Sequence, residues 1–143
     1  MVKNKMKLLY VCRANVGRSQ MAAAYHNHIY RRYGIADSTG TCIPQGKNLV
    51  KDVEDADLVI QIMQEDKIDI SQNQLKQLSV TMLPYYDKII VMAEKETCPD
   101  FLRNSIQSVL YWNIEDAKGK DFETTRRIKD EIKQKIDEES EKW

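Results

Sequence analysis

Apolar residues in this chain gather in short runs that are separated by longer amphipathic segments. Four runs, at residues 8–11, 35–41, 87–93 and 108–112, have the length of strands, and the first reads Leu-Leu-Tyr-Val without a charge. Uncharged runs of this kind are typical of strands that are buried on both faces of a parallel sheet. We therefore expect the strands to form a parallel sheet in the interior of the protein.

The segment after the first run has the composition of a helix. Residues 19–33 are rich in alanine and other strong helix formers, and Gly34 is expected to end this helix in the left-handed conformation. Residues 53–66 have an amphipathic pattern with one apolar face. That face consists of Val53, Ala56, Val59, Ile60 and Met63. The two patterns predict two helices among the first three strands.

Polar start signals indicate two further helices. Ser79 is placed to cap a short helix that ends at Tyr86, and the closing helix begins at about Asp121. The apolar stripe of the closing helix consists of Phe122, Thr125, Ile128, Ile132 and Ile136. On its charged face, Glu131 and Lys135 have the spacing of an i,i+4 ion pair. The basic residues expected to face solvent on this helix are Arg126, Arg127 and Lys129.

Strands and helices thus alternate along the chain, without a repeat, a linker or a low-complexity segment. This alternation predicts a three-layer α/β sandwich, with a parallel sheet flanked by helices, in one domain that spans residues 1–143. In such folds ligands bind at the carboxyl ends of the strands. Residues that directly follow a strand are therefore the first candidates for a functional site.

One such segment, between the first strand and the first helix, has the pattern of an anion-binding loop. Five residues separate the thiol of Cys12 from the guanidinium of Arg18. In a strand–loop–helix setting, the backbone N–H groups of the loop and the positive end of the helix converge on one point. We expect Cys12 and Arg18 to be catalytic. The residues expected to bind the anion are Arg13, Ala14, Asn15, Val16, Gly17 and Ser19.

The residue types of this loop suit nucleophilic attack on a tetrahedral oxyanion. A helix N-terminus and a nearby cation favour the thiolate, which is the nucleophilic form of a cysteine such as Cys12. Arg18 presents a planar fork that matches two oxygens of an oxyanion, and Ser19 can donate its hydroxyl to the sulfur. Asn15 and Gly17 tolerate the backbone angles of a tight loop. The alternative is that Cys12 is only a small apolar residue at the end of a buried strand.

Composition narrows the class of partner. Lysine and arginine together number 22, as do aspartate and glutamate, so the 143-residue chain has no net charge. A dedicated binder of nucleic acid or of a membrane surface would carry a basic excess, so we expect neither kind of partner. The apolar run near the N-terminus is too short for a signal peptide or a membrane span. We expect a cytoplasmic monomer or weak homodimer.

The cysteines and histidines offer little beyond the loop. Cys12, Cys42 and Cys98 are an odd and sparse set, which implies no disulfide framework and favours a reducing compartment. His26 and His28 lie two positions apart in the first predicted helix, so they face different directions. The chain has no other histidine to complete a metal site. We expect no metal and no cofactor.

The loop resembles the active-site loop of the low-molecular-weight protein tyrosine phosphatases and of their relatives, the thiol-dependent arsenate reductases. The form Cys-x-x-Asn-x-Gly-Arg-Ser-Gln-Met-Ala at residues 12–22 looks more like the arsenate-reductase branch. The similarity extends to residues 37–41, 68–71, 87–92 and 112–117. The resemblance implies strands in the order 2-1-3-4. Relatives usually carry glycine at the position of Lys67, so the helix end there is expected to be strained.

The resemblance also implies a general acid. The segment at residues 112–117 is similar to the Asp-Asp-Pro loop that supplies this acid in the family, and it places the role on Asp116. Glu115 is the neighbouring candidate. Relatives have proline where this chain has Ala117, so the loop is expected to be less rigid.

Two activities share this set of residues, and a third class, a noncatalytic anion-binding protein on the same fold, remains open. The first is phosphomonoester hydrolysis, on a phosphotyrosyl or other aryl phosphate, through a cysteinyl-phosphate. The alternative is arsenate reduction by Cys12 and external thiols.

Cys98 matches the second relay cysteine of thioredoxin-coupled reductases, but Glu94 stands where the first would be, and a carboxylate cannot relay a disulfide. Lys118 and Lys120, together with Arg13, predict a basic mouth that also suits small oxyanions. Phosphate ester hydrolysis is our sequence-based interpretation.

Overall fold

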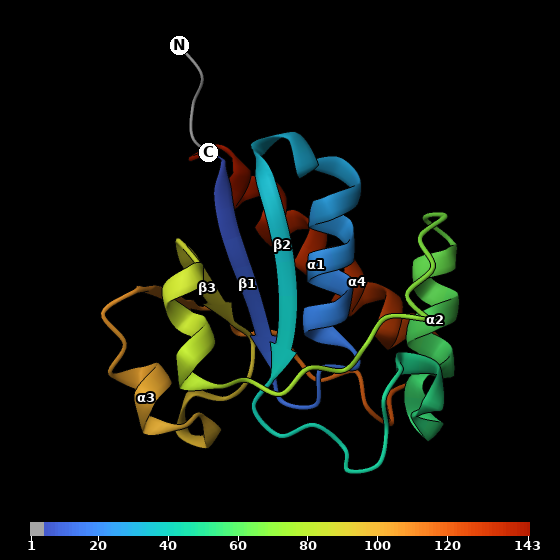
Figure 1. The fold of residues 1–143 in the computed structure, drawn as a ribbon. Coiled ribbons are helices and arrows are strands. Elements are labelled where there is room, and N and C mark those ends of the chain that lie inside the picture. Colours follow the sequence, from blue (N-terminus) through green and yellow to red (C-terminus); the bar gives the residue numbers. More distant parts are fainter. Residues whose placement is uncertain (1–4) are drawn as a thin grey trace.

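Four parallel strands form one sheet in the order β2-β1-β3-β4 (Figure 1). The structure is a computed structural model that describes residues 5–143. The strands are β1 (Met6–Cys12), β2 (Gly34–Gly40), β3 (Lys88–Val91) and β4 (Ser108–Tyr111). All four run in the same direction, and their carboxyl ends meet at one edge of the sheet. The predicted parallel sheet and its strand order are confirmed.

Both faces of the sheet are buried, which explains the uncharged runs in the sequence. Leu8 and Tyr10 of β1 pack into one hydrophobic cluster, and Leu9 and Val11 pack into another. The first cluster lies against α1 (Arg18–Ile29) and α4 (Phe122–Ser140), beyond which α2 (Asp57–Gln64) packs on α4. The second lies under the 3-10 helix η4 (Val80–Tyr85) and α3 (Asp100–Arg103). The three-layer arrangement is therefore confirmed (Figure 1).

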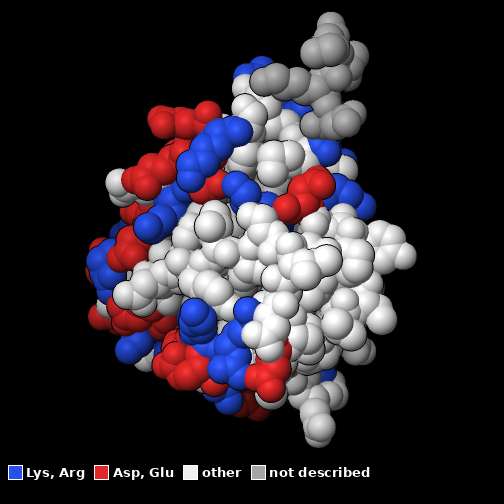
Figure 2. Space-filling view, turned by 90° about the vertical axis from the view of Figure 1, so that its left-hand side faces the viewer, with Lys and Arg blue, Asp and Glu red and all other residues white. Residues whose placement is uncertain are grey.

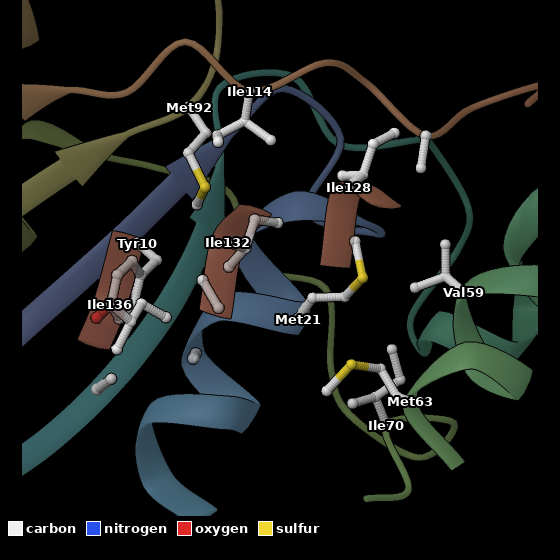
Figure 3. Close-up of a cluster of buried hydrophobic side chains, with 14 of the residues drawn as sticks. Tyr10, Met21, Val59, Met63, Ile70, Met92, Ile114, Ile128, Ile132 and Ile136 are labelled. Atoms are coloured by element: carbon white, nitrogen blue, oxygen red, sulfur yellow. The ribbon is translucent and has the colours of Figure 1, made fainter. Parts of the chain in front are cut away.

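The first hydrophobic cluster, which contains Leu8 and Tyr10 and is the larger of the two, gathers side chains from the sheet and from three helices (Figure 3). The stripe predicted for the closing helix is found there, because Ile128, Ile132 and Ile136 are at most 1% exposed. Full burial of one such side chain contributes about 1.5–3 kcal/mol. These residues fix α4 to the sheet although most of its remaining surface is charged. Phe122, at the start of the stripe, is only half-buried.

The first helix is shorter than predicted. α1 ends at Ile29, and residues 31–33 form a separate 3-10 turn (η1). Gly34 does not act as a left-handed cap but begins β2, with φ +146°. A Cβ at this position would collide with the carbonyl oxygen of Met6, so glycine permits the close approach of β1 and β2.

The second helix also begins later than the apolar pattern indicated. Two 3-10 turns, η2 (Val50–Asp52) and η3 (Glu54–Ala56), precede α2. The buried face therefore contains Ile62, whereas Ile60 is only half-buried. Beyond the end of α2, Lys67 has φ +62°, the left-handed conformation that favours glycine. The expected strain at this position is found.

The charged face of α4 differs in detail from the prediction. Glu131 accepts a hydrogen bond from Arg127, not from Lys135. Lys129 does not face solvent: its side chain is 6% exposed and its Nζ lies 3.3 Å from Oδ2 of Asp66, in the turn after α2. The helix start is as expected, since Asp121 accepts a hydrogen bond from the backbone N–H of Thr124.

The opposite side of the molecule carries an uncharged area. Figure 2 views the side on which η4 and α3 lie; charged side chains of both signs gather toward the left and the lower part of this view. Ser79 precedes η4 but contributes no side-chain cap. Val80 and Tyr85 of η4 are 54% and 71% exposed.

Among residues 5–143, no helix combines the length and the apolar character needed to cross a bilayer.

Candidate active site

The anion-binding loop predicted from the sequence lies at the carboxyl end of β1. Cys12 is the last residue of β1 and Arg18 is the first residue of α1. Asn15, in the loop, has φ +59°, a left-handed conformation that asparagine tolerates better than most residues. Gly40, at the end of β2, permits the loop to fold back, because a Cβ there would lie 2.6 Å from the Arg13 carbonyl oxygen. In the sequence, only the position of Gly40 in a Ser-Thr-Gly-Thr turn indicated that the loop approaches the end of β2 this closely.

A chain of hydrogen bonds leads from the loop to the Cys12 sulfur. Ser19 Oγ lies 3.0 Å from Cys12 Sγ, and Asn15 Nδ2 donates to the same Ser19 oxygen at 2.7 Å. Because the Ser19 oxygen accepts from Asn15, its own proton is free to be donated to the sulfur. Asn15 is held in turn, since its Oδ1 accepts from the backbone N–H of Lys76 at 2.8 Å and from Gln20 Nε2 at 3.3 Å. The thiol thus has a fixed hydrogen-bond donor beside it.

Arg18 is a buried cation with carbonyl and carboxylate partners. Its side chain is 2% exposed, and Nη1 donates to the carbonyl oxygens of Met92 at 2.6 Å and Ile114 at 3.2 Å. Two carboxylates compensate its charge: Glu94 Oε1 lies 3.6 Å from Nη1, and Asp116 Oδ2 lies 3.6 Å from Nη2. Since the carbonyls fix one edge of the guanidinium, its orientation does not depend on a ligand. Sequence reasoning treated Glu94 only as a missing cysteine and did not predict this contact.

Asp116, the candidate general acid, lies in the loop that follows β4. Its side chain is 49% exposed, and its Oδ1 accepts a hydrogen bond from the backbone N–H of Lys118 at 3.0 Å. The next residue, Ala117, is buried, and a Cβ added at Gly17 would lie 3.9 Å from Ala117 Cβ. The acid loop therefore rests directly on the anion-binding loop, and its carboxylate is brought to the same pocket as the thiol.

The pocket at this edge of the sheet has a volume of about 250 Å³. From the predicted set, it is lined by Cys12, Ala14, Val16, Gly17, Arg18 and Asp116. Three further segments complete the pocket: the chain before α2 and the start of α2, with Pro44, Lys47, Val53, Glu54, Asp55 and Val59, and the acid loop, with Ala117 and Lys118. Sequence reasoning assigned Val53 and Val59 to the apolar face of a packed helix. It missed Pro44, Lys47, Glu54 and Asp55 because no motif marks these positions. In the part of the chain that the structure describes, none of these lining side chains is aromatic.

One expectation about the site needs correction, and one stays a prediction. Binding of the anion by Arg13 stays a prediction, since its side chain is exposed and does not line the pocket but its backbone N–H belongs to the loop. The mouth was expected to be basic, yet Lys47 and Lys118 share it with Glu54 and Asp55. Asn15 and Ser19 lie behind the pocket wall and act on Cys12 through hydrogen bonds. Within residues 5–143, no three His, Cys, Asp or Glu side chains are grouped so that they could hold a metal ion.

The other two cysteines lie apart from this pocket. Cys98 is 4% exposed and belongs to the hydrophobic cluster under η4 and α3. Its thiol donates to the carbonyl oxygen of Glu94 at 3.5 Å, and burial raises the pKa of Cys98. Cys42 is exposed, and both are free thiols. Neither sulfur lines the pocket that contains Cys12.

Comparison with known proteins gives matches over nearly the whole chain. The family described as low molecular weight phosphotyrosine protein phosphatase matches residues 7–142. An arsenate reductase from Bacillus cereus is 25% identical over 136 residues, which cover 94% of each chain. The solved low molecular weight protein tyrosine phosphatase from T. tengcongensis has a TM-score of 0.80 at 23% identity, covering 97% of this chain and 100% of its own. The thioredoxin-dependent arsenate reductase of Corynebacterium glutamicum has a TM-score of 0.73 at 25% identity, covering 99% of this chain and 63% of its own.

Proposed function

Because the chain belongs to the low molecular weight phosphotyrosine protein phosphatase family, whose catalysis is based on cysteine, we propose that it hydrolyses phosphate monoesters. The observation that carries the proposal is the placement of the Asp116 carboxylate, 3.6 Å from the Arg18 guanidinium and in one pocket with Cys12. Ester hydrolysis needs an acid for the leaving oxygen, whereas anion binding alone does not. A carboxylate at the mouth of an anion cradle therefore favours the hydrolase.

The proposed reaction has two steps. The Cys12 thiolate attacks phosphorus in line, the P–O bond to the leaving group breaks, and Asp116 transfers its proton to the departing oxygen. In the second step Asp116 takes a proton from water, the water oxygen attacks phosphorus, and the P–S bond breaks to release phosphate. Loop N–H groups and Arg18 hold the equatorial oxygens in both steps, and each such donor lowers the barrier by ~3–4 kcal/mol. Ser19 stabilises the sulfur as nucleophile and as leaving group.

The pocket walls indicate what the ester carries. Val16, Val53 and Val59 line the pocket beside the cradle and provide an apolar surface for a ring. We therefore assign aryl phosphates, phosphotyrosine among them, as the substrate class. The charged groups at the mouth, of both signs, would contact the part of a substrate beyond the ring.

Arsenate reduction is the second candidate, and two observations favour it. A relative that is 25% identical is named an arsenate reductase, and Cys98 occupies the position of a relay cysteine. The contacts of Cys98 weigh against an internal relay, because its sulfur is held in the cluster on the other face of the sheet. Arsenate would then receive its two electrons from Cys12 and an external thiol.

A paired assay separates the two activities. Hydrolysis of p-nitrophenyl phosphate is measured beside arsenate-dependent oxidation of glutathione and of a thioredoxin system, with Cys12→Ser as the blank for all three. We expect ester cleavage that Cys98→Ser leaves intact. Arsenate-dependent thiol oxidation with negligible ester cleavage would reverse the order of the two candidates, and loss of that oxidation in Cys98→Ser would identify an internal relay.

A further inference from the structure

An ion pair holds the outer side of the loop that carries Asp116. Glu115 directly precedes Asp116, and Glu115 Oε1 accepts a hydrogen bond of 2.8 Å from Arg127 Nη2 on α4. Arg127 Nη1 donates to Glu131 Oε1, also at 2.8 Å, and Lys120 Nζ lies 3.5 Å from Glu115 Oε2. Arg127 holds the pKa of Glu115 below its usual range, so the carboxylate is ionised at neutral pH. The loop is thereby joined to a helix that is anchored in the core.

The loop has little rigidity of its own. Residue 117 is alanine, which leaves φ free, and Gly119 adopts φ +71°. The backbone N–H of Lys120 donates to the Ala117 carbonyl oxygen at 3.1 Å, which closes a turn within the loop. Such a turn sets the local shape but not the distance between the loop and the anion cradle.

That distance matters for the proposed reaction. A general acid must come within hydrogen-bond reach of the leaving oxygen, and a displacement of about 1 Å can cost about 10²-fold in rate. Asp116 is half exposed and lies 3.6 Å from Arg18 Nη2, beyond hydrogen-bond distance. Ile114, whose carbonyl oxygen accepts a hydrogen bond from Arg18, and the buried Ala117 hold the loop backbone on its inner side. The Asp116 carboxylate itself accepts its hydrogen bond from Lys118 of the same loop, which does not tie it to the cradle.

We propose that Glu115 and Arg127 are positioning residues for the general acid. Their ion pair holds the backbone just before Asp116, so that the carboxyl group stays over the mouth of the anion cradle. This inference rests on the proposed hydrolase function and adds the residues that align its acid. Arg127 does not line the pocket, so it acts on the reaction only through Glu115.

The neighbouring arginine provides a matched control. Arg126 lies one position earlier on α4, and it pairs with Glu65 at 2.6 Å and with Glu123 at 3.0 Å. Both of these partners lie outside the acid loop. Arg126→Gln and Arg127→Gln thus remove the same charge from the same helix, but only Arg127→Gln releases Glu115.

The test measures kcat/KM for two esters that differ in leaving group. Phenol is a poorer leaving group than p-nitrophenol, so phenyl phosphate depends more on protonation by Asp116. We expect Arg127→Gln and Glu115→Gln each to lower kcat/KM for phenyl phosphate by about threefold to fivefold, the range of an exposed ion pair. The loss of kcat/KM for p-nitrophenyl phosphate should stay below about twofold. Arg126→Gln should leave kcat/KM unchanged for both esters.

Two further measurements separate positioning from general stability. In an Asp116→Asn background, Arg127→Gln should have no additional effect, because there is no acid left to align. The variants should melt within a few degrees of the native protein. Equal losses for both esters, equal effects of Arg126→Gln and Arg127→Gln, or a full effect in the Asp116→Asn background would each overturn the inference. A native protein that cleaves neither ester would instead overturn the proposed function.

Discussion

Glu94 Oε1 lies 3.6 Å from Arg18 Nη1, so an exposed carboxylate faces the buried cation of the anion cradle. The Arg18 guanidinium keeps its orientation through the carbonyl oxygens of Met92 and Ile114. What Glu94 adds is therefore negative charge beside the guanidinium that is proposed to hold the anion. Because Glu94 is 51% exposed, solvent screens this repulsion to a modest size.

Removal of that charge should strengthen anion binding. We expect Glu94→Gln to lower the inhibition constant of inorganic phosphate by about twofold to fivefold, measured against p-nitrophenyl phosphate hydrolysis. Glu96→Gln removes a charge from the same segment and serves as the control, with little change expected. Weaker phosphate inhibition in Glu94→Gln than in Glu96→Gln would mean that Glu94 orients Arg18 rather than repelling the anion.

Replacement of the nucleophile should separate binding from turnover. Cys12→Ser keeps a side chain that can bond to Ser19 but is a much weaker nucleophile, so we expect kcat to fall by at least about 10⁴-fold. Binding of phosphate and tungstate, measured by calorimetry, should persist because Arg18 and the loop N–H groups remain. Full activity in Cys12→Ser would exclude a cysteinyl-phosphate. An inactive native protein that still binds these anions would point to the noncatalytic class.

The loss caused by removing the acid should depend on the leaving group. Asp116→Asn cannot donate the proton, so we expect kcat/KM to fall by about 10²-fold or more for phenyl phosphate and by less than about tenfold for p-nitrophenyl phosphate. Asp55→Asn changes another carboxylate of the same pocket and is the matched control. A uniform loss for both esters in Asp116→Asn would contradict its role as the acid.

The parts of the fold that could be predicted are those that depend on neighbours in sequence. The β1 run, the loop and the start of α1 follow one another, so the proximity of Cys12 and Arg18 was readable from a short segment. The 3-10 turns before α2 were not, because they have a different residue rotation from an α-helix. Ile62 was therefore missed, whereas Ile60 packs against the core as predicted but is only half-buried.

Contacts between distant segments explain most of the remaining differences. Glu94 meets Arg18 across 76 positions of the chain, and its exposed, polar segment has no motif that indicates the contact. Lys129 was expected in solvent because no sequence pattern shows that Asp66, in the turn after α2, lies beside it. The two lysines and two carboxylates at the pocket mouth come from separate segments, so their balance of charge appeared only in the structure.

The buried histidine should make the protein sensitive to mild acid. His26 is 0% exposed, with Nδ1 3.1 Å from the Tyr10 hydroxyl and Nε2 3.0 Å from the Gly34 carbonyl oxygen. Burial lowers the pKa of His26. The unfolded chain, with a histidine pKa of about 6.5, therefore binds the proton more readily than the folded protein. The contribution of the neutral His26 to the free energy of unfolding is therefore fully present above about pH 6.5. It is lost as the pH falls below this value, by up to about 1.4 kcal/mol per pH unit.

Two measurements check this. The melting temperature should fall between about pH 7 and pH 5, a window above the titration of ordinary carboxylates. In His28→Gln, His26 is the remaining histidine, so a single imidazole signal can be followed by NMR. Its midpoint should lie below about 6.5. A midpoint above this value would show that the hydrogen-bond partners favour the charged ring.

The left-handed residue after α2 offers a stabilising substitution. Lys67 has φ +62° and an exposed side chain, and this conformation costs a residue with a Cβ about 1–2 kcal/mol. Lys67→Gly removes this cost but gives the unfolded chain more freedom, so we expect a net gain of about 0.5–1 kcal/mol in the free energy of unfolding. The measurement is urea denaturation at constant pH. Lys135→Gly, in the interior of α4, is the control and should lose about 1 kcal/mol. If Lys67→Gly were destabilised to the same extent as Lys135→Gly, the backbone at residue 67 would not be strained in solution.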